Sequence, residues 1–154
     1  MPRYFAYGSN MSTKLMGRVC PQAAPIGPAQ LDGWRFIVMR RGYASVVPHP
    51  GAVVHGVLWQ ITARDVAALN AFENIGSGLY ARRILSVRRG ARREPALIYV
   101  SPERREGRPR PGYQALVVEA ARAWNLPADY VAALERWAPS RFAGAFAIDA
   151  GENG

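Results

Sequence analysis

Glu73 is the acidic residue whose place in the sequence points most directly to chemistry. Residues 63–73 are predicted to form a helix, because Thr62 and Asp65 have capping-box spacing and apolar residues recur at helical intervals. At about 100° per residue, Glu73 falls about 20° from Val66, on the apolar face of this helix. A carboxylate there is partly desolvated, so its pKa rises toward neutrality and it can carry protons near pH 7. From the helix alone, a last-turn glutamate that bends back into water is the favoured interpretation.

A second candidate is the loop Tyr7-Gly8-Ser9-Asn10, which follows a short aromatic and apolar run predicted to be a strand over residues 3–7. A turn between a strand and a helix can aim successive backbone N–H groups at one point. Such a cradle binds an anion or stabilises an oxyanion. Ordinary strand-to-helix turns use the same residue types, so the loop alone does not separate a binding site from a structural turn.

The other reactive side chains have simpler structural explanations. His55 lies in an apolar run, where a hydrogen-bonded structural histidine is the favoured interpretation. Cys20 is the only cysteine, so it cannot form an internal disulfide, and it has no histidine near it in the sequence. No Cys/His cluster offers four metal ligands, so we expect neither a structural metal nor a nucleophilic cysteine.

The charge balance is strongly basic, with 20 Lys and Arg against 11 Asp and Glu and a sequence pI near 10.6. Such a balance suits an anionic partner such as nucleic acid. However, 19 of the 20 cations are arginine, in a chain rich in Ala, Gly and Pro, which is typical of a GC-rich genome. We therefore expect a nucleic-acid partner to be unlikely, and we interpret the arginine pairs at 82–83, 88–89 and 92–93 as solvated strand ends.

The chain has 154 residues, which predicts one domain over residues 1–148 and a flexible tail over 149–154. It has no run of about 18 apolar residues, and its first residues lack a secretory signal. We therefore expect a cytoplasmic protein without membrane association.

The order of the predicted elements indicates an α+β fold, built as a small mixed β-barrel with flanking helices. The predicted strands cover residues 3–7, 34–40, 44–47, 53–61, 79–89 and 95–100, the predicted helices cover 11–18, 63–73, 113–124 and 128–137, and a long loop covers 101–112.

Several short strings occur in the order in which one protein family has them. They are YFAYGSNM at 4–11, LDGWRF at 31–36, VHGVLW at 54–59, LNAFE at 69–73 and GLY at 78–80. Residues 113–137 also look like the family's closing helices. Over nearly its whole length, the chain resembles the γ-glutamylcyclotransferase-like (AIG2-like) family.

This resemblance implies a six-stranded barrel type of fold and a cofactor-free, metal-free reaction on a small γ-glutamyl compound. The substrate's free α-amine attacks its own γ-carbonyl, which expels an amine or amino acid and leaves 5-oxoproline. Glu73 aligns with the family's acid/base carboxylate. The residues that match the substrate pocket are Tyr7, Gly8, Ser9, Asn10 and Tyr80, with Tyr113 as a further member beyond a loop of variable length.

Some questions stay open at this point. Relatives that prefer glutathione carry a different residue at the place of Asn10, which argues against glutathione as the substrate. The Gly-rich connection 74–78 is expected to shape the leaving-group side. The alternative function is a non-catalytic module of the same fold that binds a small ligand or nucleic acid. The leaving amine and the oligomeric state are not determined.

Overall fold

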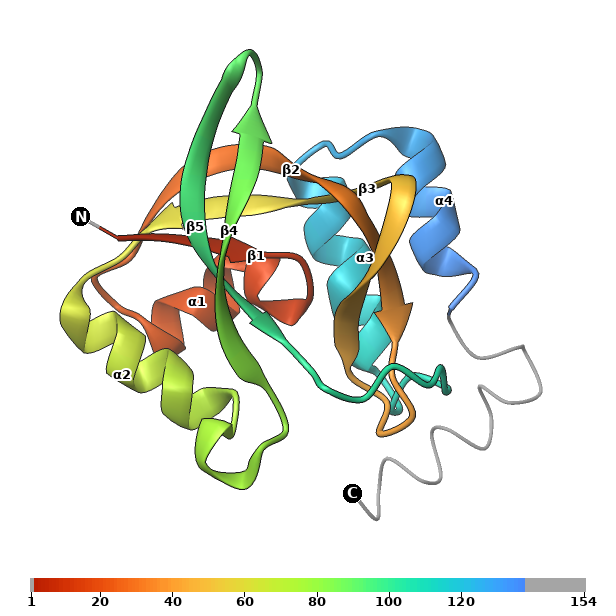
Figure 1. Cartoon of the computed structure of the whole chain (residues 1–154), viewed down its shortest axis with the longest axis horizontal. Helices are drawn as coiled ribbons and strands as arrows, with labels where there is room; N and C mark the ends of the chain where they lie inside the picture. The colour runs from red at the N-terminus through yellow and green to blue at the C-terminus, as the bar shows by residue number, and fades with distance from the viewer. Residues whose placement is uncertain (1, 138–154) are drawn as a thin grey trace.

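A closed barrel of five strands forms the centre of the computed structural model, which describes residues 2–137 (Figure 1). The strands are β1 (Arg3–Ala6), β2 (Ala24–Val38), β3 (Ala44–Gln60), β4 (Ala81–Arg89) and β5 (Arg92–Val100). Around the barrel they follow the order β1–β3–β2–β4–β5, and β1 closes the barrel by pairing in parallel with β5. The predicted mixed barrel is thereby confirmed. The predicted domain end at residue 148 and the tail 149–154 lie outside the described residues.

The two longest strands explain why the barrel has five strands rather than six. The segments 44–47 and 53–61, predicted as separate strands, belong to the single strand β3. β2 begins about ten residues earlier than predicted, and it pairs with β3 from Ala24 opposite Gln60 to Val38 opposite Ala44. Register shifts lie beside Pro25 and Asp32, and the first of these lets the strand accommodate a residue without an N–H donor.

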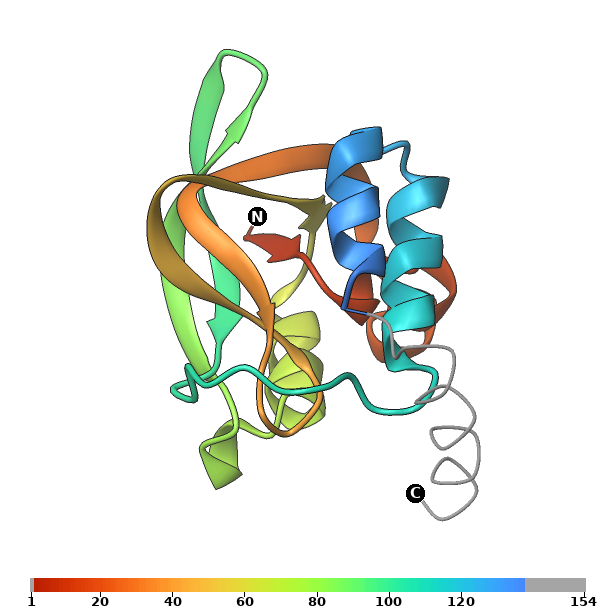
Figure 2. The same cartoon turned by 90° about the vertical axis from the view of Figure 1, so that its right-hand side faces the viewer.

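Helices cover the barrel from different sides. They are α1 (Thr13–Val19), α2 (Ala63–Phe72), α3 (Tyr113–Ala123) and α4 (Ala128–Glu135), with the single 3₁₀ turns η1 (Ser9–Met11) and η2 (Ile75–Ser77). Figures 1 and 2 show α3 and α4 side by side at one side of the barrel, with α2 at another. No helix in residues 2–137 is long and apolar enough to cross a membrane.

α2 begins with the predicted capping box. The Asp65 N–H donates to Thr62 Oγ1 at 3.2 Å, and the Thr62 N–H donates to Asp65 Oδ2 at 2.8 Å. At the other end, Asn74 adopts left-handed backbone angles (φ 53°), a conformation that ends helices. Glu73 is therefore the last residue of the turn, and its N–H donates to Leu69 O at 2.8 Å.

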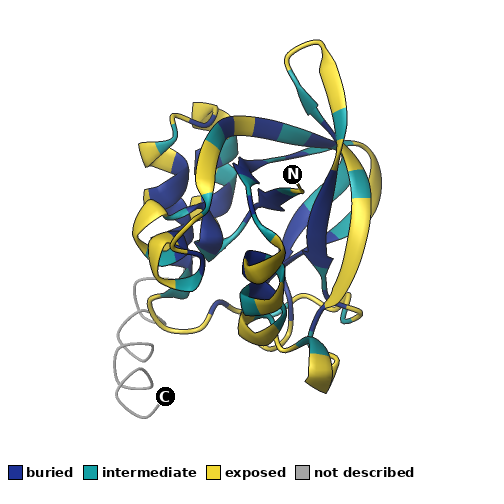
Figure 3. Ribbon diagram, turned by 90° about the vertical axis from the view of Figure 1, so that its left-hand side faces the viewer, coloured by how far each residue is buried: buried dark blue, intermediate teal, exposed yellow. Residues whose placement is uncertain are grey.

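The two apolar residues in the second half of α2 differ in exposure. Leu69 is fully buried, but Phe72 is 42% exposed although helical spacing places it near the same face. Phe72 and Glu73, at the end of the helix, line a cavity. Figure 3 shows the buried residues concentrated on the inner strands, while the projecting tip of the β4–β5 hairpin is exposed.

The close approach of β1 and β3 requires a glycine at position 56. A Cβ atom there would overlap the carbonyl oxygen of Ala6 and lie 2.7 Å from the ring of Phe5, which is itself fully buried. Neither the strand backbone nor a packed ring can move away cheaply.

We therefore expect Gly56→Ala to lower the free energy of unfolding by about 1–3 kcal/mol or more. Urea denaturation followed by circular dichroism measures this change. Gly17→Ala is the matched control, because a Cβ atom at Gly17 in α1 meets nothing within 4 Å. Alanine there is expected to be neutral or to stabilise by up to about 1 kcal/mol. Equal effects of the two substitutions would contradict the steric explanation.

Candidate active site

A cavity of about 340 Å³ opens where the end of β1, the end of α2 and the start of α3 meet. This volume lies within the range of roughly 300–1,000 Å³ that is typical of small-molecule sites. All of the predicted site residues line it, namely Tyr7, Gly8, Ser9, Asn10, Glu73, Tyr80 and Tyr113. The remaining lining residues are Tyr4, Leu15, Tyr43, Ala44, Phe72, Asn74, Leu79, Tyr99 and Leu116.

Glu73 is the one charged residue among those that line this cavity. Its side chain is half-buried, and Asn10 Nδ2 donates to its Oε1 at 3.4 Å. Burial raises the pKa of Glu73 from its ordinary value of 4.5 to about 7, because desolvation disfavours the charged form. A group with this pKa exchanges protons readily near neutral pH.

Asn10 is the side chain that orients Glu73. It is 3% exposed, and its Nδ2 donates to Tyr4 Oη at 3.0 Å as well as to Glu73. Its Oδ1 is buried without a partner in residues 2–137. A buried acceptor of this kind usually has a partner, so Oδ1 is an exception among the buried polar atoms of the site.

The loop before η1 carries N–H groups that its own turn leaves without a backbone acceptor. The first bond within the turn is that from Met11 N–H to Gly8 O at 3.1 Å, so the N–H groups of Gly8, Ser9 and Asn10 have no acceptor within it, and the backbone of Ser9 faces the Tyr113 hydroxyl. The end of η1 is anchored by Trp124, the residue that follows α3, whose Nε1 donates to Met11 O at 2.8 Å. Three successive donors thus border the same cavity as Glu73.

The predicted tyrosines hold the cavity wall through the backbone. Tyr7 Oη donates to Tyr99 O, and Tyr80 Oη donates to Ala44 O, each at 2.5 Å. The Ala44 N–H donates to Tyr113 Oη at 3.2 Å. Burial raises the pKa of all three predicted tyrosines, so they are neutral phenols at pH 7. Because the Tyr80 hydroxyl hydrogen is used on Ala44, Tyr80 can offer a ligand only its lone pairs.

Three further tyrosines of the cavity, Tyr4, Tyr43 and Tyr99, are not marked as site residues by the sequence analysis. Tyr4 accepts the hydrogen bond from Asn10, and its ring packs edge-on against Tyr99 with centroids 5.9 Å apart. Tyr99 Oη in turn donates to Asn70 Oδ1 at 2.7 Å, which links β5 to α2. Tyr4 lies inside the quoted YFAYGSNM string, whereas no motif marks Tyr99, because its position depends on the closure of β1 against β5.

His55 and Cys20 lie outside the cavity lining. The His55 ring packs against Tyr130 of α4 with centroids 4.7 Å apart, and burial lowers its pKa. Its Nδ1 has no partner in residues 2–137, so the expected hydrogen bond at that atom is not seen. Cys20 is buried with its thiol 3.7 Å from Asp65 O, and burial raises its pKa to about 11, which keeps it protonated and unreactive. Within the described part of the chain, no three His, Cys, Asp or Glu side chains gather as metal ligands would.

The expected Gly-rich connection 74–78 contributes to the cavity only through its first residue, Asn74. Residues 75–77 form η2, and Leu79, the residue after the connection, also lines the cavity. The glycines themselves do not line it.

Comparison with known proteins places this site in a family. The profile of the family described as gamma-glutamyl cyclotransferase, AIG2-like, matches residues 4–123. The chain belongs to this family. It is 24% identical to the gamma-glutamylcyclotransferase of Mus musculus and 25% identical to that of Homo sapiens, in each case over 92% of this chain and 81% of the relative.

Solved structures agree on the fold. A gamma-glutamyl cyclotransferase superposes with a TM-score of 0.84 at 23% identity, covering 99% of both chains. A Homo sapiens protein, loc79017, superposes with a TM-score of 0.83 at 25% identity, covering 90% of this chain and 89% of that chain. YkqA from Bacillus subtilis superposes with a TM-score of 0.77 at 24% identity, covering 88% of this chain and 53% of its own.

The raised pKa of Glu73 predicts how stability depends on pH. Between pH 4.5 and 7 the folded protein holds a proton on Glu73 that the unfolded chain has released. The contribution of this group to stability is therefore complete below pH 4.5 and is lost as pH rises through 7. Glutamine does not ionise, so Glu73→Gln removes this pH-dependent loss of stability. The free energy of unfolding of the variant therefore rises relative to that of the unsubstituted protein between pH 4 and pH 8, by up to about 3 kcal/mol.

Urea denaturation at a series of pH values measures this gain. Glu119→Gln, on the exposed side of α3, controls for the general effect of removing a carboxylate. A stability difference between Glu73→Gln and the unsubstituted protein that stays constant with pH would show that Glu73 is not desolvated.

Proposed function

We propose that this protein is a γ-glutamyl cyclotransferase that converts a γ-glutamyl compound into 5-oxoproline and a free amine or amino acid, with Glu73 as acid and base. One observation carries this proposal: a carboxyl group whose pKa burial raises to about 7 borders the same cavity as a loop whose N–H groups have no acceptor within their own turn. Family membership and the named relatives support it.

The loop would bind the glutamyl part of the substrate. The N–H groups of Gly8, Ser9 and Asn10 are suited to the α-carboxylate or to the γ-carbonyl oxygen, on which negative charge develops. Gly8 has no room for a side chain, because a Cβ atom would lie 3.0 Å from Tyr113 Oη and 3.2 Å from Ala44 Cβ. The substrate is thus held folded, with its own amine near its γ-carbon.

Glu73 would then move the protons. As a carboxylate it takes a proton from the substrate's α-ammonium, and the freed amine attacks the γ-carbonyl carbon to close the five-membered ring. The protonated Glu73 gives its proton to the leaving nitrogen as the old C–N bond breaks. The attacking nitrogen loses its second proton when the lactam forms, and the released amine takes up a proton in water. The two protons lost by the α-ammonium are thus balanced by the two gained by the leaving nitrogen, which enters water as an ammonium ion. Because one molecule supplies both reacting groups, the step needs no covalent enzyme intermediate and no cofactor.

Asn10 would position the base for this proton transfer. Its Nδ2 holds Glu73 Oε1 at 3.4 Å, beside the cavity that both residues line. The Tyr4 hydroxyl fixes the amide plane through the 3.0 Å bond to Nδ2. The base is thereby held by a buried side chain that is itself fixed.

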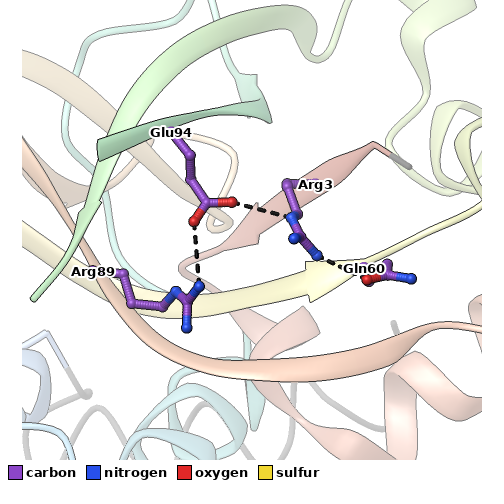
Figure 4. A network of polar contacts seen from close by, with 4 residues as sticks. All are labelled: Arg3, Gln60, Arg89 and Glu94. Atoms are coloured by element: carbon purple, nitrogen blue, oxygen red, sulfur yellow. Dashed lines mark hydrogen bonds and ion pairs between the residues drawn. The ribbon is translucent and has the colours of Figure 1, made fainter. Parts of the chain in front are cut away.

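The alternative of a nucleic-acid-binding module is disfavoured by the arginines of the β4–β5 hairpin. Figure 4 shows Glu94 between Arg3 and Arg89, at 3.1 Å and 3.5 Å, with Arg3 also donating to Gln60 at 2.9 Å. Farther along, Arg88 and Arg93 both pair with Asp32. Several of the cations that raise the net charge are therefore used inside the molecule.

The proposal predicts that Glu73→Gln lowers kcat/KM by about 10²–10⁴-fold, because an amide cannot exchange the proton. Release of 5-oxoproline from a panel of γ-glutamyl dipeptides and γ-glutamyl amines measures this. Glu119→Gln is the control and is expected to keep full activity. A fully active Glu73→Gln variant would refute the acid/base role, and an inactive unsubstituted protein across the panel would refute the cyclotransferase activity on those compounds.

The pH profile gives an independent prediction. The kcat/KM of the unsubstituted protein is expected to rise with pH through about 7, as Glu73 becomes a carboxylate. Asn10→Asp keeps the shape of the side chain but places a like charge beside Glu73, so the rise should move upward by about one pH unit or more. An unchanged profile in this variant would show that Asn10 does not contact the base during the reaction.

A further inference from the structure

The mouth of the cavity carries an unusual concentration of exposed apolar side chains. In residues 2–137, the large apolar side chains that stand out as exposed are Phe72 (42%), Leu116 (51%) and Ile84 (67%). Phe72 and Leu116 line the cavity, although they come from α2 and α3, far apart in the sequence. Leu79 joins them from the segment before β4. Exposed apolar groups gathered at a cavity mouth are typical of a surface that a ligand covers.

The charge of the cavity lining indicates which kind of ligand group would bind at this apolar mouth. Its lining within the described residues includes no arginine, lysine or histidine, and Glu73 is the charged member. The backbone N–H groups of residues 8–10 can pair with one carboxylate, which the glutamyl part already supplies. A second carboxylate, on the leaving group, would enter a partly desolvated space with only another anion nearby, which is unfavourable.

The nearest cations lie beyond the apolar rim. Arg41 and Arg105 line a separate shallow hollow that meets the cavity at Leu79. The guanidinium of Arg110 lies 5.0 Å from the centre of the Tyr43 ring, and its Nε donates to Arg41 O. A charged leaving group would therefore meet a positive partner only outside the cavity lining, past Leu79 or past the Tyr43 ring.

We propose that the leaving group of the substrate is a primary amine of the alkyl or arylalkyl class, with no carboxylate or other charged substituent, whose apolar part packs on Phe72, Leu79 and Leu116. This inference rests on the cyclotransferase function proposed above and narrows its substrate class. The chemistry is unchanged: the bond from the γ-carbon to the amine nitrogen breaks, and the amine departs with the proton from Glu73.

A matched pair of substrates tests the proposal. γ-Glutamyl-phenethylamine and γ-glutamyl-phenylalanine differ by a single carboxylate on the leaving group. We expect the phenethylamine compound to have a kcat/KM at least about tenfold higher, measured by 5-oxoproline release. Equal values, or a preference for the phenylalanine compound, would overturn the proposal while leaving the cyclotransferase function intact.

Two further compounds separate the size of the leaving group from its charge. γ-Glutamyl-methylamine is expected to be a poorer substrate than γ-glutamyl-phenethylamine, and γ-glutamyl-glycine poorer still. Turnover of the two small compounds alone would show that the apolar rim does not bind the leaving group. If none of the four compounds is turned over, the proposed function fails, and calorimetric binding of the matched pair to the unsubstituted protein then decides whether the apolar preference exists.

Variants locate the subsite. Phe72→Ser and Leu116→Ser should each lower the preference for the phenethylamine compound several-fold. Ile84→Ser is the control: Ile84 is also an exposed apolar side chain, but it does not line this cavity, so the preference should stay unchanged. Arg41→Gln should leave both members of the matched pair unaffected. A loss of activity in Arg41→Gln that is confined to the phenylalanine compound would show that its carboxylate reaches Arg41, and would overturn the proposal.

Discussion

The desolvation of one carboxyl group, Glu73, is the constraint on which the rest of the site depends. Water would hold this group ionised well below neutral pH, so its useful pKa exists only while the cavity wall shields it. The shield consists of tyrosines and leucines that come from every part of the fold. Keeping an ionisable side chain in such a place costs stability at neutral pH, which is a common property of active sites.

The barrel supplies the rigidity that this arrangement needs. β1 leads directly into the loop whose N–H groups belong to residues 8–10, and β3 leads into α2, which is followed by Glu73. Because β1 and β3 are neighbours in the barrel, the loop and helix α2 follow directly after two adjacent strands. The glycine at position 56 lets these two strands approach closely, so a feature of the core also affects the distance between the two halves of the site.

The distribution of charge fits a small substrate better than a polyanion. Acidic residues are few, but Asp32 and Glu94 each pair with two arginines at the β4–β5 hairpin. The cavity itself has no cation among its described lining residues, which instead offer backbone N–H groups and neutral phenols. Recognition by such groups depends on hydrogen-bond geometry rather than on net charge.

The sequence by itself determined the features that depend on neighbours along the chain. Thr62 and Asp65 cap α2 because they are three residues apart, and the residues of the Tyr7–Asn10 loop are those that a strand-to-helix turn requires. The residues expected at the site were found together because a local pattern or a family motif marks each one. Only the tertiary structure decided the rest. The union of two predicted strands into β3, the exposure of Phe72 and the contact of Tyr99 with Tyr4 all depend on which distant segments pair around the barrel. Pairing of that kind is set by the closure of the whole sheet, and the periodicity of a single segment carries no information about it.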